Sequence, residues 1–379
     1  MKKIKICFIG TNPNFDGGIT LLQKNLIDYI KYMKIPYEIT WIYMGKNNAR
    51  YSKKEVKYIE LKTPKILFLE DILFNRSVLK FLKENDFDVI NSHAIWGYWM
   101  KNYKKKLNQK IVHTYHGTAY YFLKNSLKRF GILKKIMLSP TLWWGYFLEK
   151  PPMRKADNII CVSEKVKKHL EMLYGIKRKI EILRTGVNLR NFKPFDKEKA
   201  KKQLNLDAKN SYGLYIGGGG FWTKGLDRVI NLSEKIYEKN KNYKLIIIGS
   251  DYNKVKHLLN KKFIIFLYKI PRDKIHLYYS ASDVFFCLSR YEGGAPTLVV
   301  SEAMASGCLL VCSKDSEQEI IEDKKNCLVV KDFDKNDAKK IMKVLKDKKE
   351  KEKIIKNSIK TVKKFSLEKW GEKYSKILK

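Results

Sequence analysis

Two glutamates lie on either side of a glycine-containing loop in the segment SRYEGGAPTLVVSEAMASG, residues 289–307. The apolar run DVFFCLS before it predicts a buried strand, and the run SEAMAS predicts a helix that ends at Gly307. Glu292 comes before the loop, and Glu302 lies inside the predicted helix. Ionised carboxylates accept hydrogen bonds from hydroxyl groups and repel phosphates. We therefore expect the two glutamates to bind a neutral group rich in hydroxyls.

The loop between the glutamates suits an anion instead. Gly293 and Gly294 precede Pro296, and proline is well tolerated at the first position of a helix. We expect the helix to begin at Pro296 and to direct its N-terminus toward the loop. Unpaired backbone N–H groups and the helix dipole make such an N-terminus favourable for a phosphate.

Two further glycine loops follow predicted strands. NPNFDGGIT places Gly17 and Gly18 at the start of a predicted helix, and GGGGFWTKG, residues 217–225, contains Lys224. Glycines let backbone N–H groups approach a diphosphate, and lysine adds a point charge. A flexible turn with a solvated lysine has the same residues, and the second loop matches neither the dinucleotide-binding fingerprint nor the P-loop. A diphosphate at these loops and hydroxyls at the glutamates together indicate a nucleotide sugar.

A histidine ends another predicted strand, KIVHTYHG. His116 precedes Gly117, and an imidazole in this position can hydrogen-bond a sugar hydroxyl. A histidine packed in the core fits the same position. We interpret His113 in this run, and His93 in NSHAIWG, as core residues.

The order of the elements predicts an α/β fold with two domains. A chain of 379 residues is longer than a single core usually supports. Short apolar runs alternate with amphipathic helical segments in both halves, which is typical of parallel sheets covered on both faces. The polar segment in KIEILRTGVNLRNFKPFD indicates a linker. We expect two doubly wound, Rossmann-like domains facing a central cleft, residues 1–190 and 191–361.

The charge is strongly unbalanced, with 78 Lys and Arg against 39 Asp and Glu, a net charge of +39. Such an excess favours polyanions: nucleic acid, an anionic membrane surface or phosphorylated substrates. Lysines on solvated helix faces explain part of it. We find no RNA-recognition or zinc motif, which argues against a nucleic-acid-binding protein.

Residues 120–157 interleave aromatic and basic side chains at roughly helical spacing and include the adjacent Trp143 and Trp144. This composition suits a surface that enters the interfacial zone of a bilayer. An ordinary pair of amphipathic helices packed on the sheet fits equally well, so both interpretations stay open.

The sequence predicts a cytoplasmic protein that is peripheral on the membrane at most. The apolar run at the N-terminus is too short for a signal peptide, and no window approaches the length of a membrane span. The six cysteines form no C-x-x-C pair, so we expect buried free thiols and no metal site.

An ordered series of segments along the whole chain resembles a known family. The segments are DGGITLLQKNL, HTYHGT, ADNIICVSE, LRTGVNLRNFKP, GGGGFWTKGLDRVI, SASDVFFCLSRYEGG, SEAMASG and EQEIIEDKKNCLVV. The series is similar to that of the retaining GT-B glycosyltransferases of family four, the glycosyl transferases group 1.

The resemblance implies roles for these residues. His116 would contact the transferred sugar, Lys224 would neutralise the leaving diphosphate and Glu292 would lie by the sugar; these are the expected catalytic residues. The resemblance also implies a final helix, residues 362–379, that packs back on the first domain, and no obligatory metal or other cofactor. The residues expected to contact the nucleotide part of the donor are Gly17, Gly18, Gly218, Gly219, Lys224, Gly293, Gly294, Glu302 and Glu319.

The chain departs from the family pattern in two places. Its paired glutamates are ten positions apart, whereas eight is usual in the family. Gly218 and Gly219 occupy positions where the family usually has an arginine that binds the diphosphate. Backbone N–H groups or another cation must replace it, and Arg290 and Arg228 are candidates.

We expect a retaining hexosyltransferase that uses a UDP- or GDP-linked sugar. Its partners would be this donor, a glycan or lipid-linked acceptor and an anionic membrane surface, in the synthesis of a cell-surface polysaccharide or glycolipid. A non-catalytic, glycosyltransferase-like partner subunit and a nucleotide-sugar epimerase of similar fold are the alternatives.

Overall fold

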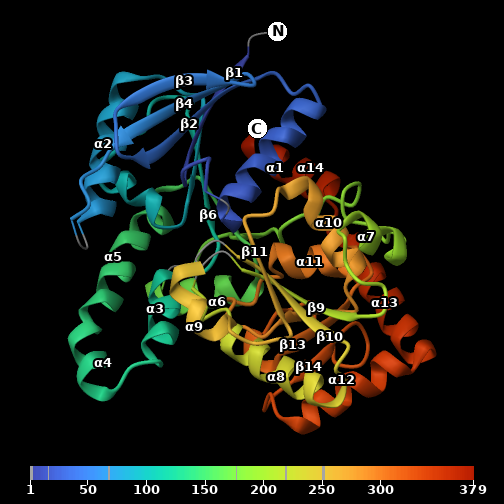
Figure 1. Cartoon of the computed structure of the whole chain (residues 1–379). Coiled ribbons are helices and arrows are strands. Elements are labelled where there is room, and N and C mark those ends of the chain that lie inside the picture. The colour runs from blue at the N-terminus through green and yellow to red at the C-terminus, as the bar shows by residue number, and fades with distance from the viewer. Residues whose placement is uncertain (1–2, 16, 67–68, 176, 218–219, 250–251) are drawn as a thin grey trace. The chain divides into compact units, whose positions relative to one another are not determined.

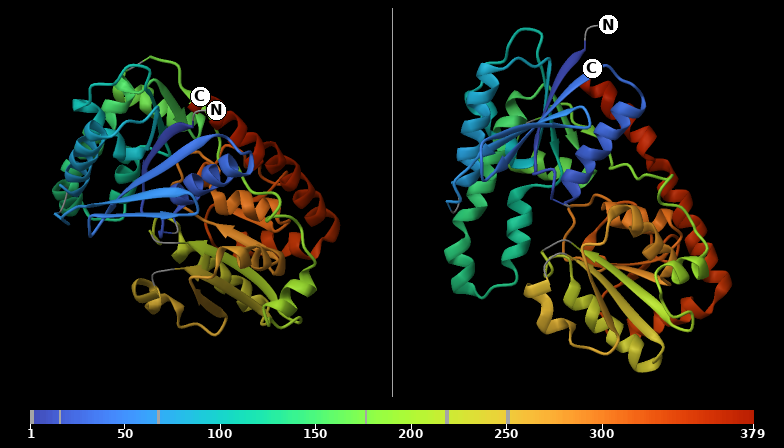
Figure 2. Two further views of the ribbon diagram at one scale, coloured as in Figure 1. Left: turned by 90° about the horizontal axis from the view of Figure 1, so that it is seen from above. Right: turned by 45° about the horizontal axis from the view of Figure 1, so that its top comes forward.

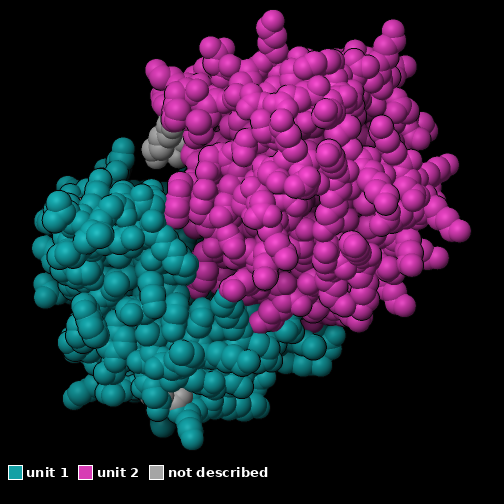
Figure 3. All heavy atoms as spheres, turned by 90° about the horizontal axis from the view of Figure 1, so that it is seen from below, with its two compact units in different colours: residues 1–185, 370–379 teal, residues 186–369 magenta. Residues whose placement is uncertain are grey.

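The computed structural model describes residues 3–15, 17–66, 69–175, 177–217, 220–249 and 252–379. The chain forms two compact units: unit 1 consists of Met1–Thr185 and Trp370–Lys379, and unit 2 consists of Gly186–Lys369. Figure 3 colours the two units separately. Each unit is an α/β fold, as the sequence predicts.

The division differs from the predicted domain limits at both ends of unit 2. The sequence placed the first border after residue 190 and the return helix at 362–379, whereas unit 2 runs from Gly186 to Lys369. The physical reason is a backbone contact that holds the two ends of unit 2 together. The N–H of Val187 donates to Phe365 O at 2.9 Å, and the N–H of Leu367 donates to Val187 O at 2.8 Å.

Unit 1 contains an eight-stranded sheet in the order β3-β4-β2-β1-β5-β6-β7-β8 (Figure 1). All its neighbouring strands are parallel except the antiparallel pair β3 and β4 at one edge. The strands are β1 (Ile4–Gly10), β2 (Tyr37–Gly45), β3 (Ala49–Lys53), β4 (Val56–Lys62), β5 (Val89–His93), β6 (Lys110–Tyr115), β7 (Asn158–Cys161) and β8 (Glu181–Ile182).

Helices connect these strands, and the C-terminal helix of the chain also packs in unit 1. The helices are α1 (Gly18–Tyr32), α2 (Glu70–Glu84), η1 (Ala94–Asn102), α3 (Ala119–Leu127), α4 (Ile132–Leu138), α5 (Pro140–Lys155), α6 (Glu164–Tyr174) and α14 (Leu367–Leu378). In α14 the hydroxyl of Tyr374 lies 2.6 Å from Thr114 Oγ1 of β6, so this helix is fastened to the sheet.

Unit 2 contains a six-stranded parallel sheet in the order β11-β10-β9-β12-β13-β14. Its strands are β9 (Ser211–Gly217), β10 (Tyr243–Gly249), β11 (Ile264–Tyr268), β12 (Val284–Cys287), β13 (Leu309–Ser313) and β14 (Leu328–Val330). Its helices are α7 (Lys197–Gln203), α8 (Leu226–Lys239), α9 (Tyr252–Leu259), η2 (Arg272–Lys274), α10 (Ile275–Ala281), α11 (Leu298–Ala305), η3 (Lys314–Ser316), α12 (Lys335–Lys346), α13 (Lys348–Val362) and η4 (Lys363–Phe365).

Separate hydrophobic clusters cover the two faces of the unit 2 sheet. Phe286 of β12 packs with α8 and α12, whereas its neighbour Phe285 packs with α10 and α11. Successive side chains of a strand point to opposite faces, so a strand covered on both faces must be apolar throughout. This requirement explains the unbroken apolar runs in the sequence. Because the strands are parallel, their carboxyl ends lie at one edge of the sheet, where the following loops can hold ligands.

Helices α3, α4 and α5 form a helical hairpin in unit 1, in which α3 and α5 lie side by side (Figure 2). Pro151 and Pro152 lie within α5 and do not end it. On α4 the apolar side chains Ile132 and Leu133 are 76% and 86% exposed. The hairpin therefore presents an apolar surface, and α4 is not packed on the sheet.

No helix in the described part of the chain combines the length and the apolar composition needed to cross a membrane. All six cysteines are buried and unpaired, as expected from their positions in strand-like runs.

A buried carboxyl group fastens α5 to the loop after β6. Glu149 Oε2 accepts a hydrogen bond from the N–H of Ala119 at 2.9 Å, and the Tyr115 hydroxyl donates to the Glu149 carbonyl at 2.6 Å. Burial raises the pKa of Glu149 to about 8, and the bond from Ala119 offsets only part of this rise. The carboxyl group is therefore largely protonated at neutral pH.

This raised pKa predicts that the protein loses stability in mild base. A carboxyl group with a pKa of 4.5 in the unfolded chain and about 8 in the folded chain holds its proton longer when folded, so stability falls as the pH rises through this window. Between pH 6.5 and 8 we expect a fall of about 2 kcal/mol in the free energy of unfolding. Urea denaturation at both pH values measures it. Glu149→Gln, which cannot ionise, should flatten the dependence, and an equal slope in the variant would contradict the assignment.

Gly225 closes the turn before α8 with a left-handed backbone, φ = 70°, and a Cβ placed there would lie 2.0 Å from Leu288 O. We expect Gly225→Ala to cost about 3 kcal/mol, because backbone strain and a steric clash add. Gly307 in the same unit has φ = 75° but its nearest neighbour would be 3.4 Å away. Gly307→Ala should cost only about 1 kcal/mol in the same urea titration. Equal losses would show that the clash relaxes.

Candidate active site

The loop after β12 holds Glu292 in contact with the glycine loop after β9. Lys224 Nζ donates to Glu292 Oε2 at 2.6 Å, and the Ser289 hydroxyl donates to the other oxygen of the same carboxylate. The Glu292 side chain is only 5% exposed, whereas Lys224 is 41% exposed. Burial alone would lower the pKa of Lys224, but the Glu292 carboxylate raises it above its ordinary value. Lys224 is therefore protonated at neutral pH. The structure brings these two predicted residues together.

The second predicted glutamate is also bound to a cation. Glu302 of α11 is 1% exposed and forms a two-point ion pair with Arg272, in which Nη1 lies 3.0 Å from Oε2. The Tyr279 hydroxyl lies 3.2 Å from the same Oε2. The Arg272 guanidinium also lies over the Phe192 ring, 4.9 Å from its centre. The sequence did not single out Arg272.

The helix after the glycine loop begins later than predicted. Thr297 is its N-cap residue and Leu298 its first residue, so Pro296 precedes the cap. The backbone N–H of Thr297 donates to Gln318 Oε1 at 3.1 Å. Gly293 and Gly294 have φ values of 66° and 83°, which require glycine for an unstrained turn. The tight turn between β12 and α11 thus uses both glycines.

Glu319 contacts this loop through its backbone, because its N–H donates to Gly294 O at 2.9 Å. This bond places Glu319 beside the loop, while its role toward a nucleotide stays a prediction. Gly218 and Gly219 lie outside the described residues. The Tyr215 hydroxyl is buried against Gly217, the last residue of β9, and has no hydrogen-bond partner among the described residues.

The two arginines considered as replacements for the missing family arginine form ion pairs with other acidic residues. Arg290 forms a two-point ion pair with Asp227, with N···O distances of 2.8 and 2.6 Å. Arg228 pairs with Asp315 at 2.7 Å. Arg272 is the arginine that the structure places beside a predicted nucleotide-binding residue.

In unit 1, His116 lies at the carboxyl end of β6 and contacts a second histidine. His116 Nε2 is 2.9 Å from His93 Nδ1, and His93 Nε2 is 2.8 Å from Asn91 Oδ1. Asn91 also donates from Nδ2 to the Tyr374 hydroxyl at 3.1 Å. Burial lowers the pKa of His116 to about 4 and that of His93 well below its ordinary value, so both rings are neutral at pH 7.

These bonds determine which ring nitrogens carry protons. Asn91 Oδ1 can only accept, so His93 must donate from Nε2 and accept at Nδ1. His116 must then donate from Nε2, which leaves its Nδ1 as an acceptor. Such a nitrogen can accept a hydrogen bond from a sugar hydroxyl. His93 therefore holds the His116 ring in place, a contact that the interpretation of His93 as a core residue does not predict.

His113 is a core residue, as predicted from its position in the strand. It is fully buried, and its Nδ1 lies 2.8 Å from Ser92 Oγ. The pairing of His93 with His116 follows from topology, because both residues lie at the carboxyl ends of the neighbouring parallel strands β5 and β6. Strand order, which local sequence patterns do not give, is the signal that would have found it.

The first glycine loop ends at α1. Gly17 is the N-cap position and Gly18 is the first helical residue, and no side chain among the described residues caps this N-terminus. Close to it, Gln23 is fully buried against Gly10, and both of its amide atoms have no hydrogen-bond partner in the described structure. The sequence did not indicate Gln23. That this N-terminus binds the donor diphosphate stays a prediction.

Among the described residues, no group of three His, Cys, Asp or Glu side chains is placed to hold a metal ion. That the reaction needs no metal stays a prediction.

Two sequence families match the chain. The family described as "Glycosyltransferase Family 4" matches residues 36–191, and "Glycosyl transferases group 1" matches residues 196–361. An uncharacterized glycosyltransferase of Methanocaldococcus jannaschii is 22% identical over 364 residues, 90% of this chain and 88% of that protein.

Solved structures share the fold over nearly the whole chain. Sucrose-phosphate synthase from Thermosynechococcus elongatus superposes with a TM-score of 0.79 at 19% identity, covering 99% of this chain and 98% of that one. Anabaena HepE in complex with UDP-glucose gives a TM-score of 0.71 at 17% identity, covering 99% of each chain. With two Rossmann-like units of the GT-B type and both family matches, the chain belongs to the group 1 glycosyltransferases.

Proposed function

We propose that the protein transfers a hexose from a UDP- or GDP-linked sugar to a hydroxyl of a glycan or lipid-linked acceptor, with retained anomeric configuration. The observation that carries the proposal is the pair of buried carboxylates in unit 2, Glu292 and Glu302, each holding a cation at the carboxyl ends of the strands. Anabaena HepE, which shares the fold, binds UDP-glucose. A donor of the same class fits both the cations and the carboxylates.

Lys224 is the group that we expect to act on the leaving diphosphate. Negative charge grows on the diphosphate as the sugar–oxygen bond breaks, and a positioned cation stabilises it most in the transition state. Lys224 can turn from Glu292 to the diphosphate, because the Ser289 hydroxyl remains as a hydrogen-bond donor to the carboxylate. The backbone N–H groups at the start of α8 add to this stabilisation.

Glu302 and Arg272 are suited to the nucleoside. A carboxylate accepts hydrogen bonds from ribose hydroxyls, and the Tyr279 hydroxyl stays beside Glu302 when Arg272 moves. A guanidinium can then pair with a phosphate or stack on a base. Arg272 thereby replaces the arginine that the glycine loop lacks.

His116 is suited to orient the transferred sugar in its neutral form. Its Nδ1 accepts a hydrogen bond from a sugar hydroxyl only while the ring is unprotonated, and its pKa of about 4 ensures this at neutral pH. We assign no general base and no resident metal to the reaction. The acceptor hydroxyl attacks from the face that the diphosphate leaves, which gives retention, and its proton passes to an oxygen of the departing diphosphate.

The acceptor is proposed to be lipid-linked because of the α3–α5 hairpin. The exposed apolar side chains of α4 lie next to the basic residues Lys134 and Lys135 on the same helix. An apolar face flanked by cations binds the interface of an anionic bilayer. Synthesis of a cell-surface polysaccharide or glycolipid is the setting that this combination supports.

The decisive measurement is release of nucleoside diphosphate from a panel of UDP- and GDP-hexoses, with and without a membrane extract as the acceptor source. We expect one donor to be turned over. Lys224→Met should reduce kcat by roughly 100-fold with a smaller change in KM, because the lost contact acts mainly in the transition state. Glu302→Ala should also abolish most of the release.

Lys235→Met is the matched control, since Lys235 lies on the surface of α8 and pairs only with Glu238 among the described acidic residues. It should keep wild-type kinetics. If the wild-type protein releases no nucleoside diphosphate from any donor of the panel, the result would contradict the proposal and favour a non-catalytic partner subunit. Interconversion of donor sugars without an acceptor would indicate an epimerase.

Membrane contact through α4 predicts co-sedimentation with vesicles. Wild-type protein should bind phosphatidylglycerol vesicles more strongly than phosphatidylcholine vesicles, and high salt should weaken this binding. A variant with serine at Ile132, Leu133, Ile136 and Met137 keeps the charge but should lose most of the binding. Serine at the exposed Leu107 and Met172, which lie outside the hairpin, serves as the control. Unchanged binding of the α4 variant would exclude this helix as the contact.

A further inference from the structure

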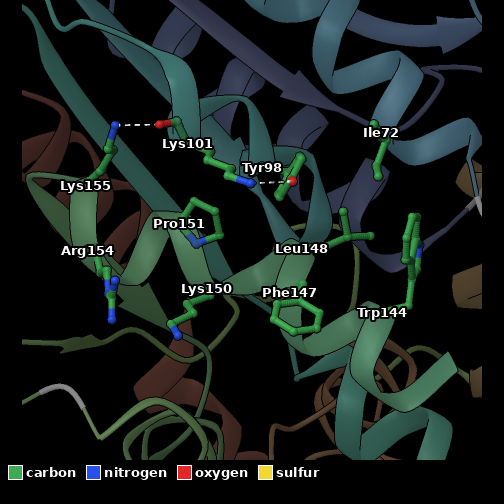
Figure 4. A pocket seen from close by; sticks show the side chains of 10 residues that line it. All are labelled: Ile72, Tyr98, Lys101, Trp144, Phe147, Leu148, Lys150, Pro151, Arg154 and Lys155. Atoms are coloured by element: carbon green, nitrogen blue, oxygen red, sulfur yellow. Dashed lines mark hydrogen bonds between the residues drawn. The ribbon is translucent and has the colours of Figure 1, made fainter. Parts of the chain in front are cut away.

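A pocket of about 450 Å³ lies in unit 1, lined by residues of α2, η1 and α5 (Figure 4). Its apolar wall consists of Ile72, Trp144, Phe147, Leu148 and Pro151. The volume is in the range of small-molecule binding sites and far above that of a single water molecule. None of the residues assigned above to donor binding or catalysis lines it.

Apart from Tyr98, the remaining lining residues are basic and lie on one side of the pocket. Figure 4 shows Lys101, Lys150, Arg154 and Lys155 away from Ile72 and Trp144, which lie on the opposite side. Lys155 Nζ donates to the backbone carbonyl of Lys101 at 2.7 Å, which places the Lys155 ammonium beside η1. No acidic side chain lines the pocket, and none of the four cations forms an ion pair with a carboxylate among the described residues.

The apolar wall and the basic side of the pocket each favour a different chemical group, so a fitting ligand carries both. An apolar wall gains free energy by covering hydrocarbon, and four cations without a carboxylate partner among the described residues favour a multiply charged anion. A sugar would leave the apolar wall uncovered, and a plain hydrocarbon would leave the cations unpaired.

We infer that this pocket binds a phosphate-bearing lipid, with a hydrocarbon chain against the α5 wall and the phosphate at Lys150, Arg154 and their neighbours. The route from a bilayer is continuous along α5. Trp143 and Phe147 of this helix are exposed, and α4 with its exposed apolar side chains directly precedes it. The inference deepens the proposed function and rests on its lipid-linked acceptor.

Isothermal titration of the whole protein with monomeric decyl phosphate, below its critical micelle concentration, tests the pocket without a membrane. Inorganic phosphate and decyl maltoside are the two other probes; they carry only the anion or only the hydrocarbon with an uncharged head. We expect saturable 1:1 binding of decyl phosphate, at least about tenfold tighter than binding of either partial probe. Equal affinity for decyl phosphate and inorganic phosphate would overturn the inference, as would equal affinity for decyl phosphate and decyl maltoside.

Two variants change the pocket in independent ways. Ile72→Trp fills the apolar side, and Lys150→Glu with Arg154→Glu reverses charge on the basic side. Each should weaken decyl phosphate at least about tenfold. Lys80→Glu with Lys83→Glu changes the net charge equally on the exposed face of α2 and should leave the affinity unchanged. Binding that survives in both pocket variants would overturn the inference, even if one of them proved poorly folded by its melting temperature.

Donor turnover separates this result from that of the proposed function. The donor-binding carboxylates lie in unit 2, so the pocket variants should still release nucleoside diphosphate from the donor in the absence of acceptor. Absence of donor turnover in the wild-type protein would contradict the proposed function, whereas the decyl phosphate titration would still decide whether the pocket binds a lipid phosphate.

Discussion

The burial of two carboxylates in unit 2 is the constraint on which the proposed site depends. Glu292 and Glu302 are 5% and 1% exposed, and an ionised carboxylate in such a position is costly unless a cation and further hydrogen bonds satisfy it. Lys224 and Arg272 provide the cations. In binding the carboxylates, both side chains are held at the carboxyl ends of the sheet before any ligand arrives. Each carboxylate also has a hydroxyl neighbour, Ser289 or Tyr279, which allows its cation to be shared with a phosphate.

The general architecture could be predicted from sequence because burial on both faces forces unbroken apolar strands. The apolar runs IKICFIG, YEITWIYM, YGLYIG and DVFFCLS predict strands, and they correspond to β1, β2, β9 and β12. By contrast, β3, β4 and β11 were not predicted. β3 and β11 lie at sheet edges. The β3 sequence ARYSK is mostly exposed and polar, so it lacks a continuous apolar run, whereas β11, IIFLY, is apolar throughout but only partly buried. The start of α11 was placed too early for a related reason. Proline is compatible with a first helical turn, but the hydrogen bond from Thr297 to Gln318 depends on a contact that is distant in sequence.

The site could be predicted only as far as local motifs extend. Lys224, Glu292, Glu302 and His116 follow strands, and the structure places each of them in the loop after a strand or on the helix that follows. Their partners come from elsewhere in the chain. Arg272 reaches Glu302 from η2, and His93 reaches His116 from a neighbouring strand. Such contacts depend on strand order and helix packing, so the spacing of residues in the sequence does not indicate them. The same reason explains why Arg290 and Arg228 were attractive candidates and are nevertheless engaged by Asp227 and Asp315.

The excess positive charge of the protein includes two kinds of cation, which differ in whether they pair with a carboxylate. Glu292 and Glu302 of unit 2 are buried, so each needs a cation, and this need holds Lys224 and Arg272 in place. On α5 the relation is reversed. Lys150 and Arg154 border an apolar wall, and the described residues give them no carboxylate. Cations that must neutralise a buried acid are fixed in position, which suits the transition state of a leaving diphosphate. Cations without an acid remain available to an anion that comes from outside the chain, and beside an apolar wall that anion is best carried by a lipid.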